Sequence, residues 1–246
     1  MNRILMLIAL FVIPAIASAV EPAMDIYQKM LTQYVKTETH HGTTLNWVNY
    51  TALKEDTAFT QVVKQIAEFT PGQLEGKQEK LAFYINAYNI LAIKTVVENW
   101  PLESIKDVGS FLKSVWKQEA GTIGGQPVSL DEIEHEVLRP MGDPRIHMAI
   151  VCASVSCPDL RTEPFTAEKI DEQLDDQARK FLSNPQKGLI VEGNKARTSK
   201  IFDWFAKDFD KAYGSVRMFI ALYSNLSEDT KLARGGLPYN WSVNGG

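Results

Sequence analysis

An almost continuous run of apolar residues at positions 81–97, within a predicted helix at 77–100, constrains the fold more than any other feature of this sequence. As a helix, the run leaves hardly any polar stripe, so its whole circumference needs apolar neighbours. Asn86, Asn89 and Lys94 interrupt it, and a lipid-facing membrane helix would not carry such groups without partners. The run therefore predicts a central helix, ended by Pro101, that the rest of the protein buries on all sides.

The remaining segments combine helices with a few short strands in no regular alternation. Helical spacing recurs at positions 22–36, 50–69, 129–139, 166–182, 200–210 and 215–224. Strands are predicted at 145–152 and 237–243, with hairpins within 108–128 and around Gly193-Asn194. This pattern favours an α+β fold over a Rossmann or barrel fold. We expect a single domain, residues 20–246, in which the long helix packs with other helices around a small antiparallel sheet that contains 145–152.

The N-terminal residues have the organisation of a secretory signal. Arg3 supplies a positive charge, positions 4–16 form an apolar run, and Ala17-Ser18-Ala19 matches the small-x-small cleavage pattern. The run is short for a membrane span, and no basic cluster follows it. We expect a signal peptide at residues 1–19, cleavage near Val20, no stable membrane insertion afterwards, and export to the periplasm or the medium. An uncleaved N-terminal anchor is the alternative.

Charge and motif content argue against several classes of function. The chain carries 26 basic and 30 acidic residues, a formal net charge of −4, whereas nucleic-acid binding requires a basic face. No glycine-rich phosphate loop, HExxH, GxSxG or paired CxxC motif occurs. The neighbours His40 and His41 lack a ligand-spaced acid or cysteine and are expected in a solvated turn. We therefore predict no nucleic-acid partner, no cofactor and no metal site.

Both cysteines lie in one stretch, 143–161, which runs from an apolar segment into a loop of small residues closed by a proline. Loops on a rigid scaffold often present reactive side chains. Three interpretations are open. Cys152 and Cys157 form a disulfide, which an oxidising compartment favours; or both are reduced and inert; or one is a nucleophile whose thiolate is stabilised by a histidine, a cation or a helix N-terminus.

A thiol nucleophile needs a base, and His135 is the better candidate. It follows Glu134 directly on a predicted helix, so a carboxylate is close enough to orient the imidazole. A surface histidine on a charged helix is the alternative. If 145–152 is a strand, His147 and Cys152 point to opposite faces, which disfavours a dyad of these two residues.

Four more polar residues are candidate ligand-binding groups: Asn86, Asn89, Arg145 and His147. Asn86 and Asn89 are three positions apart and so share one face of the long apolar helix. Buried amides must be hydrogen-bonded, so these two either tie the helix to neighbouring loops or line a pocket. Arg145 and His147 are expected to bind an anion or a carboxylate; the alternative for Arg145 is a buried salt bridge with an acid such as Asp143.

Five segments occur in the order LAFYINAYNILAI, SLDEIEHEVLRP, DPRIHMAIVCASVSCPDLR, IFDWFAKDF and YNWSVN. Together they resemble the family known as domain of unknown function 547, in its bacterial exported type, over about positions 25–244. The resemblance implies no general reaction. It implies that bacterial members are often exported and that plant members look like fusions to a coiled-coil segment, which fits an interaction role as well as an enzyme. Its motifs contain all eight candidate residues: Asn86, Asn89, Glu134, His135, Arg145, His147, Cys152 and Cys157. In some plant relatives the position that matches Cys157 is not cysteine, which implies that a disulfide is not general to the fold.

Two functional hypotheses from different classes follow. In the first, the protein is a binding or interaction module, and a cleft near Cys152, His135 and Asn86 holds a small molecule or a peptide. In the second, it is a thiol-dependent hydrolase or acyl-transfer enzyme with Cys152 or Cys157 as nucleophile. His135 is then the base, Glu134 orients it, and Asn86 stabilises an oxyanion. A bond between the two sulfurs favours the first hypothesis, and a sulfur within about 4 Å of a histidine nitrogen favours the second.

Overall fold

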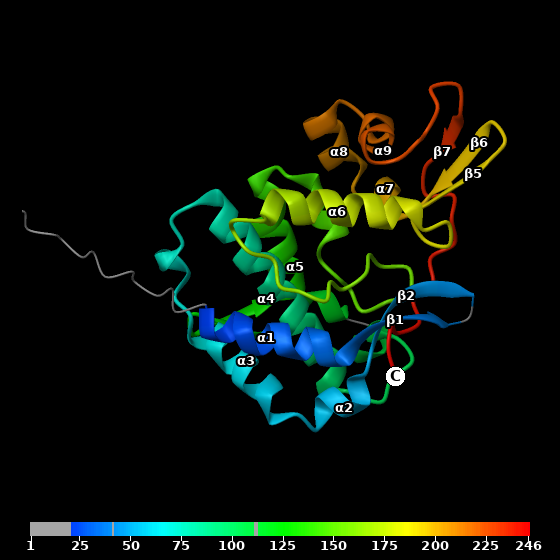
Figure 1. Cartoon of the computed structure of the whole chain (residues 1–246). Coiled ribbons are helices and arrows are strands. Elements are labelled where there is room, and N and C mark those ends of the chain that lie inside the picture. Colours follow the sequence, from blue (N-terminus) through cyan, green and yellow to red (C-terminus); the bar gives the residue numbers. More distant parts are fainter. Residues whose placement is uncertain (1–20, 41, 111–112) are drawn as a thin grey trace, which may run out of the picture.

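Helix α4 (Lys77–Glu98) lies at the centre of the molecule, with the other elements arranged around it (Figure 1). The structure, a computed structural model, describes residues 21–40, 42–110 and 113–246. The expected signal peptide lies outside these residues. Most side chains of α4 are buried, and they face all sides of the helix. The prediction of a central helix surrounded by protein is therefore confirmed.

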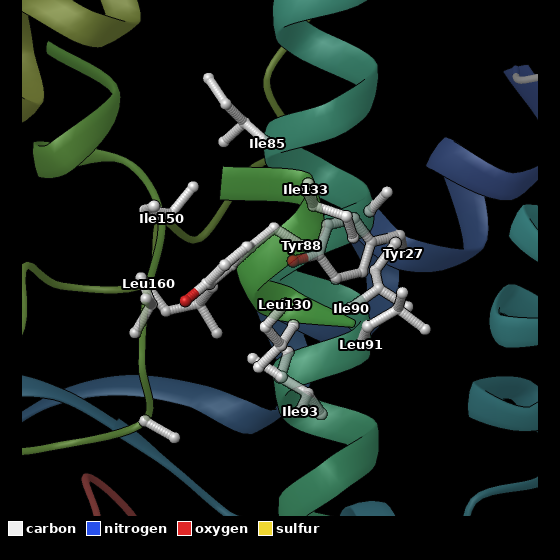
Figure 2. Packing of buried hydrophobic residues seen from close by; sticks show 14 of the residues in the cluster. Tyr27, Ile85, Tyr88, Ile90, Leu91, Ile93, Leu130, Ile133, Ile150 and Leu160 are labelled. Atoms are coloured by element: carbon white, nitrogen blue, oxygen red, sulfur yellow. The ribbon is translucent and has the colours of Figure 1, made fainter. Parts of the chain in front are cut away.

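The main hydrophobic cluster forms around α4. Helices α1 (Glu21–Tyr34), α2 (Tyr50–Lys54) and α3 (Thr57–Glu68) pack together beside it. Figure 2 shows that the side chains of this cluster come from α4 itself, from Tyr27 of α1, and from segments much later in the chain. The predicted helix 50–69 is two helices, because Asp56 caps a new helix by accepting a hydrogen bond from Ala58 N–H.

A second hydrophobic cluster is built from the C-terminal helices. Helix α6 (Ile170–Ser183) crosses the molecule above α4, and α7 (Ile201–Trp204), α8 (Ala206–Tyr213) and α9 (Val216–Tyr223) gather at its C-terminal half (Figure 1). The first half of α6 contributes to the cluster around α4, and its second half contributes to the C-terminal cluster. Helix α6 therefore links the two parts of the core.

The strands form three separate small sheets. Strands β1 (Val35–His40) and β2 (Thr43–Val48) pair antiparallel, as do β3 (Glu119–Ile123) and β4 (Gln126–Ser129). In the third sheet, β5 (Leu189–Glu192) pairs antiparallel with β6 (Lys195–Thr198), which pairs parallel with β7 (Lys231–Ala233). Helices with small antiparallel pairs make this an α+β fold, as the sequence predicts. The two predicted hairpins are confirmed as β3–β4 and β5–β6.

The strand predicted at 145–152 is wrong, and no sheet contains this segment. Residues Pro144–Met148 form a short 3-10 helix, η6. Pro144 at its start and Asp143, which accepts a hydrogen bond from Arg145 N–H, favour a helical turn. An apolar run buried inside a protein has the same sequence pattern whether it is a strand or an irregular segment. The inference that His147 and Cys152 point to opposite faces therefore does not hold.

The C-terminal segment is not the strand predicted at 237–243. It returns to the centre of the molecule in an extended form and makes two isolated bridges, Ser154 with Val243 and Val48 with Gly245. Backbone hydrogen bonds from Val155 N–H to Ser242 O (2.8 Å) and from Asn244 N–H to Ala153 O (3.1 Å) hold it against the loop 152–157, here called the cysteine loop. The last residues of the chain thereby become part of the surroundings of Cys152 and Cys157.

The helix predicted at 129–139 begins with the expected capping box. Ser129 Oγ accepts from Glu132 N–H at 3.1 Å, and Glu132 accepts from Ser129 N–H at 2.7 Å. After α5 (Leu130–Glu132) the chain continues as a π-helical turn, Ile133–Leu138. Such turns occur frequently at functional sites. This one carries Glu134 and His135 toward the cavity described below.

Candidate functional site

A cavity of about 360 Å³ lies where α4, the π-helical turn, the cysteine loop, α7 and the C-terminal segment meet. This volume is within the range of small-molecule sites. Its lining residues are Tyr88, Ser114, Trp116, Asp131, Glu134, His135, His147, Ile150, Cys152, Cys157, Pro158, Ile201, Trp204, Phe205, Tyr239 and Trp241. The walls are thus mainly aromatic and aliphatic, with a few polar groups, which is the usual composition of a ligand pocket.

His147 is a deeply buried polar residue of the cavity, with 1% of its side chain exposed. Its Nε2 lies 2.9 Å from Asp208 Oδ2, and its ring stacks on Phe205 with 3.9 Å between ring centroids. Arg139 donates to both carboxylate oxygens of Asp208, at 2.7 and 3.0 Å. The hydrogen bond from His147 and then Arg139 hold the pKa of Asp208 well below its usual range. Burial lowers the pKa of His147, so its imidazole is neutral at pH 7.

The tautomer of His147 follows from this pairing. An ionised carboxylate only accepts hydrogen bonds, so Nε2 carries the proton and Nδ1 carries the lone pair. Nδ1 is buried and has no hydrogen-bond partner among the described residues. Glu134 Oε1 is 3.7 Å away, too far for a hydrogen bond. A buried acceptor without a partner, in the wall of a cavity, is a group that a ligand proton would satisfy.

Glu134 lies beside this free nitrogen with 11% of its side chain exposed. Burial, with smaller contributions from Asp131 and Asp208, raises the pKa of Glu134 to about 7, against the lowering effect of Arg139. Its carboxyl group is therefore divided between the protonated and ionised forms near neutral pH. The cavity thus contains a neutral hydrogen-bond acceptor, Nδ1 of His147, and a carboxyl group, that of Glu134, which gains or loses a proton near pH 7.

His135 lies at the edge of the same cavity and is more exposed than His147. Arg139 Nη1 lies 2.8 Å from its Nδ1, and its Nε2 is 3.6 Å from Asp131. Because arginine only donates, Nδ1 of His135 accepts this bond, and its lone pair is already used. The sequence hypothesis pairs His135 with Glu134 as its orienting group, but the carboxylate contact of Glu134 is to His147.

The two cysteines form a disulfide with 6.2 Å between their Cα atoms, and both line the cavity. This is the first of the three interpretations that the sequence leaves open. No hydrogen bond joins either sulfur to a histidine among the residues that the structure describes. Instead, Tyr239 Oη lies 3.5 Å from the sulfur of Cys152 and 3.4 Å from that of Cys157. Neither sulfur is a free nucleophile in this state.

Asn86 and Asn89 lie on α4 outside the lining of the cavity, and each holds one loop through a pair of hydrogen bonds. Asn86 donates to Phe165 O at 2.7 Å and accepts from Phe165 N–H at 3.0 Å. Asn89 donates to Ala149 O at 3.0 Å and accepts from Val151 N–H at 2.8 Å. These contacts agree with the interpretation that the amides tie the helix to neighbouring loops.

Arg145 also lies outside the cavity. Its guanidinium group bonds to Asp143 at 2.6 Å, to Asp171 at 2.6 Å and to Asp175 at 2.8 Å. With 13% of the side chain exposed, this is the mostly buried ion pair with Asp143 that the sequence analysis offers as an alternative, extended by two acids of α6. Its donors are occupied, so they do not face a ligand.

Several residues in or next to the cavity are not predicted from the sequence. Asp208, which orients His147, lies 61 positions away in the sequence. Trp204, Tyr239 and Trp241 form an aromatic cluster, with ring centroids between 4.5 and 5.7 Å apart. The signal that could have found them is the density of aromatic residues in IFDWFAKDF and YNWSVN.

Among the described residues, no helix combines the length and apolar character needed to cross a membrane. The same part of the chain contains no group of three or more histidine, cysteine or acidic side chains placed to hold a metal ion. His40 stacks on Trp47 and contacts Glu38 at 2.7 Å in the β1–β2 hairpin, and His41 lies outside the described residues.

Comparison with known proteins finds one similarity. No curated protein and no solved structure is significantly similar to this chain. One family of sequences matches residues 71–182, the segment that carries α4, the π-helical turn, the cysteine loop and most of α6. This segment matches the family described as protein of unknown function, DUF547.

Proposed function

We propose that this protein is an exported binding protein whose cavity holds a small organic amine. The N-terminal sequence supports export. The observation that carries the binding proposal is the unpartnered Nδ1 of His147, buried in the wall of an aromatic cavity of about 360 Å³. A neutral acceptor in such a place is satisfied by a ligand that brings a hydrogen-bond donor.

The charges around the cavity favour an amine over an acid. Asp131 and Glu134 line it, and no lysine or arginine does so among the residues that the structure describes. A ligand ammonium placed between Glu134 and His147 has an N–H for each of them. A carboxylate ligand would instead face an acceptor and an acid, which is a repulsive arrangement.

The aromatic walls support the same choice. Cations bind over the faces of tryptophan, tyrosine and phenylalanine, and four such residues, Trp116, Trp204, Tyr239 and Trp241, lie together in the cavity. Lys106 Nζ already lies 4.7 Å from the ring centroid of Trp241. The apolar body of an amine would bury against the remaining surfaces.

Tryptophan fluorescence tests this proposal, because three of the five tryptophans line the cavity. Phenethylamine is expected to change the emission in a saturable manner, whereas phenylacetate, its acidic counterpart, is not. Trp204→Ala is expected to weaken the affinity about tenfold, which corresponds to a cation–π contact of about 1.4 kcal/mol. Nα-acetyl-lysine amide tests whether the amine is carried on a peptide.

A matched control makes the fluorescence experiment decisive. Trp47→Phe changes a tryptophan of the β1–β2 hairpin that is not part of the cavity, and it should leave the affinity unchanged. Equal binding of phenethylamine and phenylacetate would contradict the proposal. So would an affinity that Trp204→Ala leaves unaltered.

A thiol-dependent hydrolase is the second candidate, and one observation favours it. Asp208 orients His147 with a free Nδ1, which is the arrangement of a general base, in a cavity that also contains Cys152. His147, and not His135, is the base in this version. It requires the disulfide to be reduced, so ester hydrolysis that appears only after reduction, and that Cys152→Ser abolishes, would support it.

A further inference from the structure

We propose that the Cys152–Cys157 bond is a redox-active disulfide that accepts two electrons from a thiol compound, with attack at Cys152 and departure of Cys157. This activity goes beyond ligand binding and does not depend on an amine ligand. Both sulfurs lie in the wall of the cavity. Cys152 is partly exposed, whereas only 4% of Cys157 is exposed. An incoming thiolate therefore reaches the sulfur of Cys152 first.

A backbone hydrogen-bond donor is directed at the sulfur of Cys157: the N–H of Cys152 donates to it at 3.0 Å. Tyr239 Oη lies 3.4 Å from the sulfur of Cys157 and 3.5 Å from that of Cys152, and Ser154 Oγ lies 3.2 Å from the sulfur of Cys152. Ser154 Oγ donates to Tyr239 Oη at 3.3 Å, which directs the hydroxyl proton of Tyr239 away from Ser154. Burial raises the pKa of Tyr239, so this hydroxyl is protonated at neutral pH. Donors of this kind stabilise a thiolate and make it the better leaving group.

The cysteine loop is held without the disulfide. Its backbone bonds to the C-terminal segment at Val155, Ser156 and Ala153, and Asn240 N–H donates to Ser156 Oγ at 2.8 Å. A disulfide that closes so short a loop restricts the unfolded chain less than one that closes a long loop. The bond is therefore not required to hold the loop, and the two sulfurs stay near each other when it opens.

The reaction is balanced as two consecutive thiol–disulfide exchanges. A thiolate of an external dithiol attacks the sulfur of Cys152; a new S–S bond forms, the Cys152–Cys157 bond breaks, and Cys157 leaves as a thiolate. The second thiol of the dithiol then attacks the mixed disulfide and releases Cys152. One dithiol is oxidised to its disulfide, and the protein gains two electrons and, after protonation from water, two thiols.

Dithiothreitol serves as the dithiol in the test. The native protein at pH 7 is expected to gain two free thiols, counted by mass after alkylation, and to retain its circular dichroism. Tyr239→Phe should slow this reduction about fivefold, and Tyr34→Phe, which removes a hydroxyl that bonds to Asp56, should not. In the Cys152→Ser background, Tyr239→Phe should also raise the pKa of the Cys157 thiol, measured from the pH dependence of alkylation. A merely structural role of Tyr239 would leave that pKa unchanged.

Reaction of the oxidised protein with glutathione, a monothiol, locates the attacked sulfur. Peptide mass mapping after alkylation should find the mixed disulfide on Cys152 and the released thiol on Cys157. If Tyr239→Phe does not fold, Ser154→Ala keeps the tyrosine ring and should slow reduction to a smaller degree. The proposal is overturned if the cysteines alkylate without a reductant, if reduction requires unfolding, or if the mixed disulfide forms equally on both cysteines.

Discussion

Replacing Asn89 with leucine is expected to lower the free energy of unfolding by about 4 kcal/mol. Asn89 is 2% exposed, and its amide is the hydrogen-bond partner of both Ala149 O and Val151 N–H. Leucine has a similar size but no polar atoms, so it leaves both backbone groups buried and unpaired. Each such group costs about 1–3 kcal/mol. Urea unfolding, followed by circular dichroism, measures the difference.

Asn86→Leu is the matched comparison, because it removes the same kind of paired contact from Phe165. We expect a similar loss of stability from both variants, but a different effect on the cavity. The segment that Asn89 holds carries Ile150 and leads into Cys152, which line the cavity, whereas Phe165 does not. Phenethylamine binding should therefore weaken more in Asn89→Leu. A loss of less than about 1 kcal/mol with an unchanged denaturant slope would show that this contact does not hold the loop.

Glu134→Gln is expected to stabilise the protein by roughly 3 kcal/mol at pH 8 and by less than about 1 kcal/mol at pH 5. Burial raises the pKa of this carboxyl group from 4.5 to about 7. Between these values the folded protein holds a proton that the unfolded chain has released, so stability falls as the pH rises. Glutamine resembles the protonated acid and never ionises. Urea unfolding of both proteins at the two pH values gives the four free energies required.

Other groups near Glu134 also respond to pH, so the difference between the two proteins is the relevant quantity. The lowered pKa of His147 reduces stability as the pH falls below its unfolded value near 6.5, but it does so in both proteins. Arg139, Asp131 and Asp208 are likewise present in both. Glu136→Gln, at an exposed position of the same turn, is the control and should give the same small difference at pH 5 and pH 8. An equal effect of Glu134→Gln at both pH values would show that this carboxyl is not buried as described.

The sequence predicts those features that depend on local pattern. The apolar run that becomes α4, the capping box at Ser129 and the Gly193-Asn194 hairpin are each determined by residues that are neighbours in the chain. The disulfide is one of three interpretations that the sequence cannot separate, because its formation depends on how the loop bends. The α+β class follows from the order of these elements.

The features that the sequence does not predict depend on distant residues. Ala149 O and Val151 N–H need no strand partner, because the side chain of Asn89 on α4 bonds to both. His147 acquires its orientation from Asp208, and the aromatic wall forms only when the C-terminal segment returns to the cysteine loop. Contacts between residues so far apart in the sequence leave no periodicity or motif from which they could be predicted. The sequence pattern favours His135 as a base because it follows Glu134 directly, and it carries no signal for Asp208, 61 positions from His147.

The most direct test of the binding site is a nitrogen-15 NMR measurement on the side chain of His147, at pH 7, without and with phenethylamine. We expect Nε2 to carry the proton in both states and the signal of the unprotonated Nδ1 to move when the amine is added, because the ligand N–H bonds to it. A proton on Nδ1 in the free protein, or an Nδ1 signal that stays unchanged while tryptophan fluorescence reports saturation, would contradict the site as described.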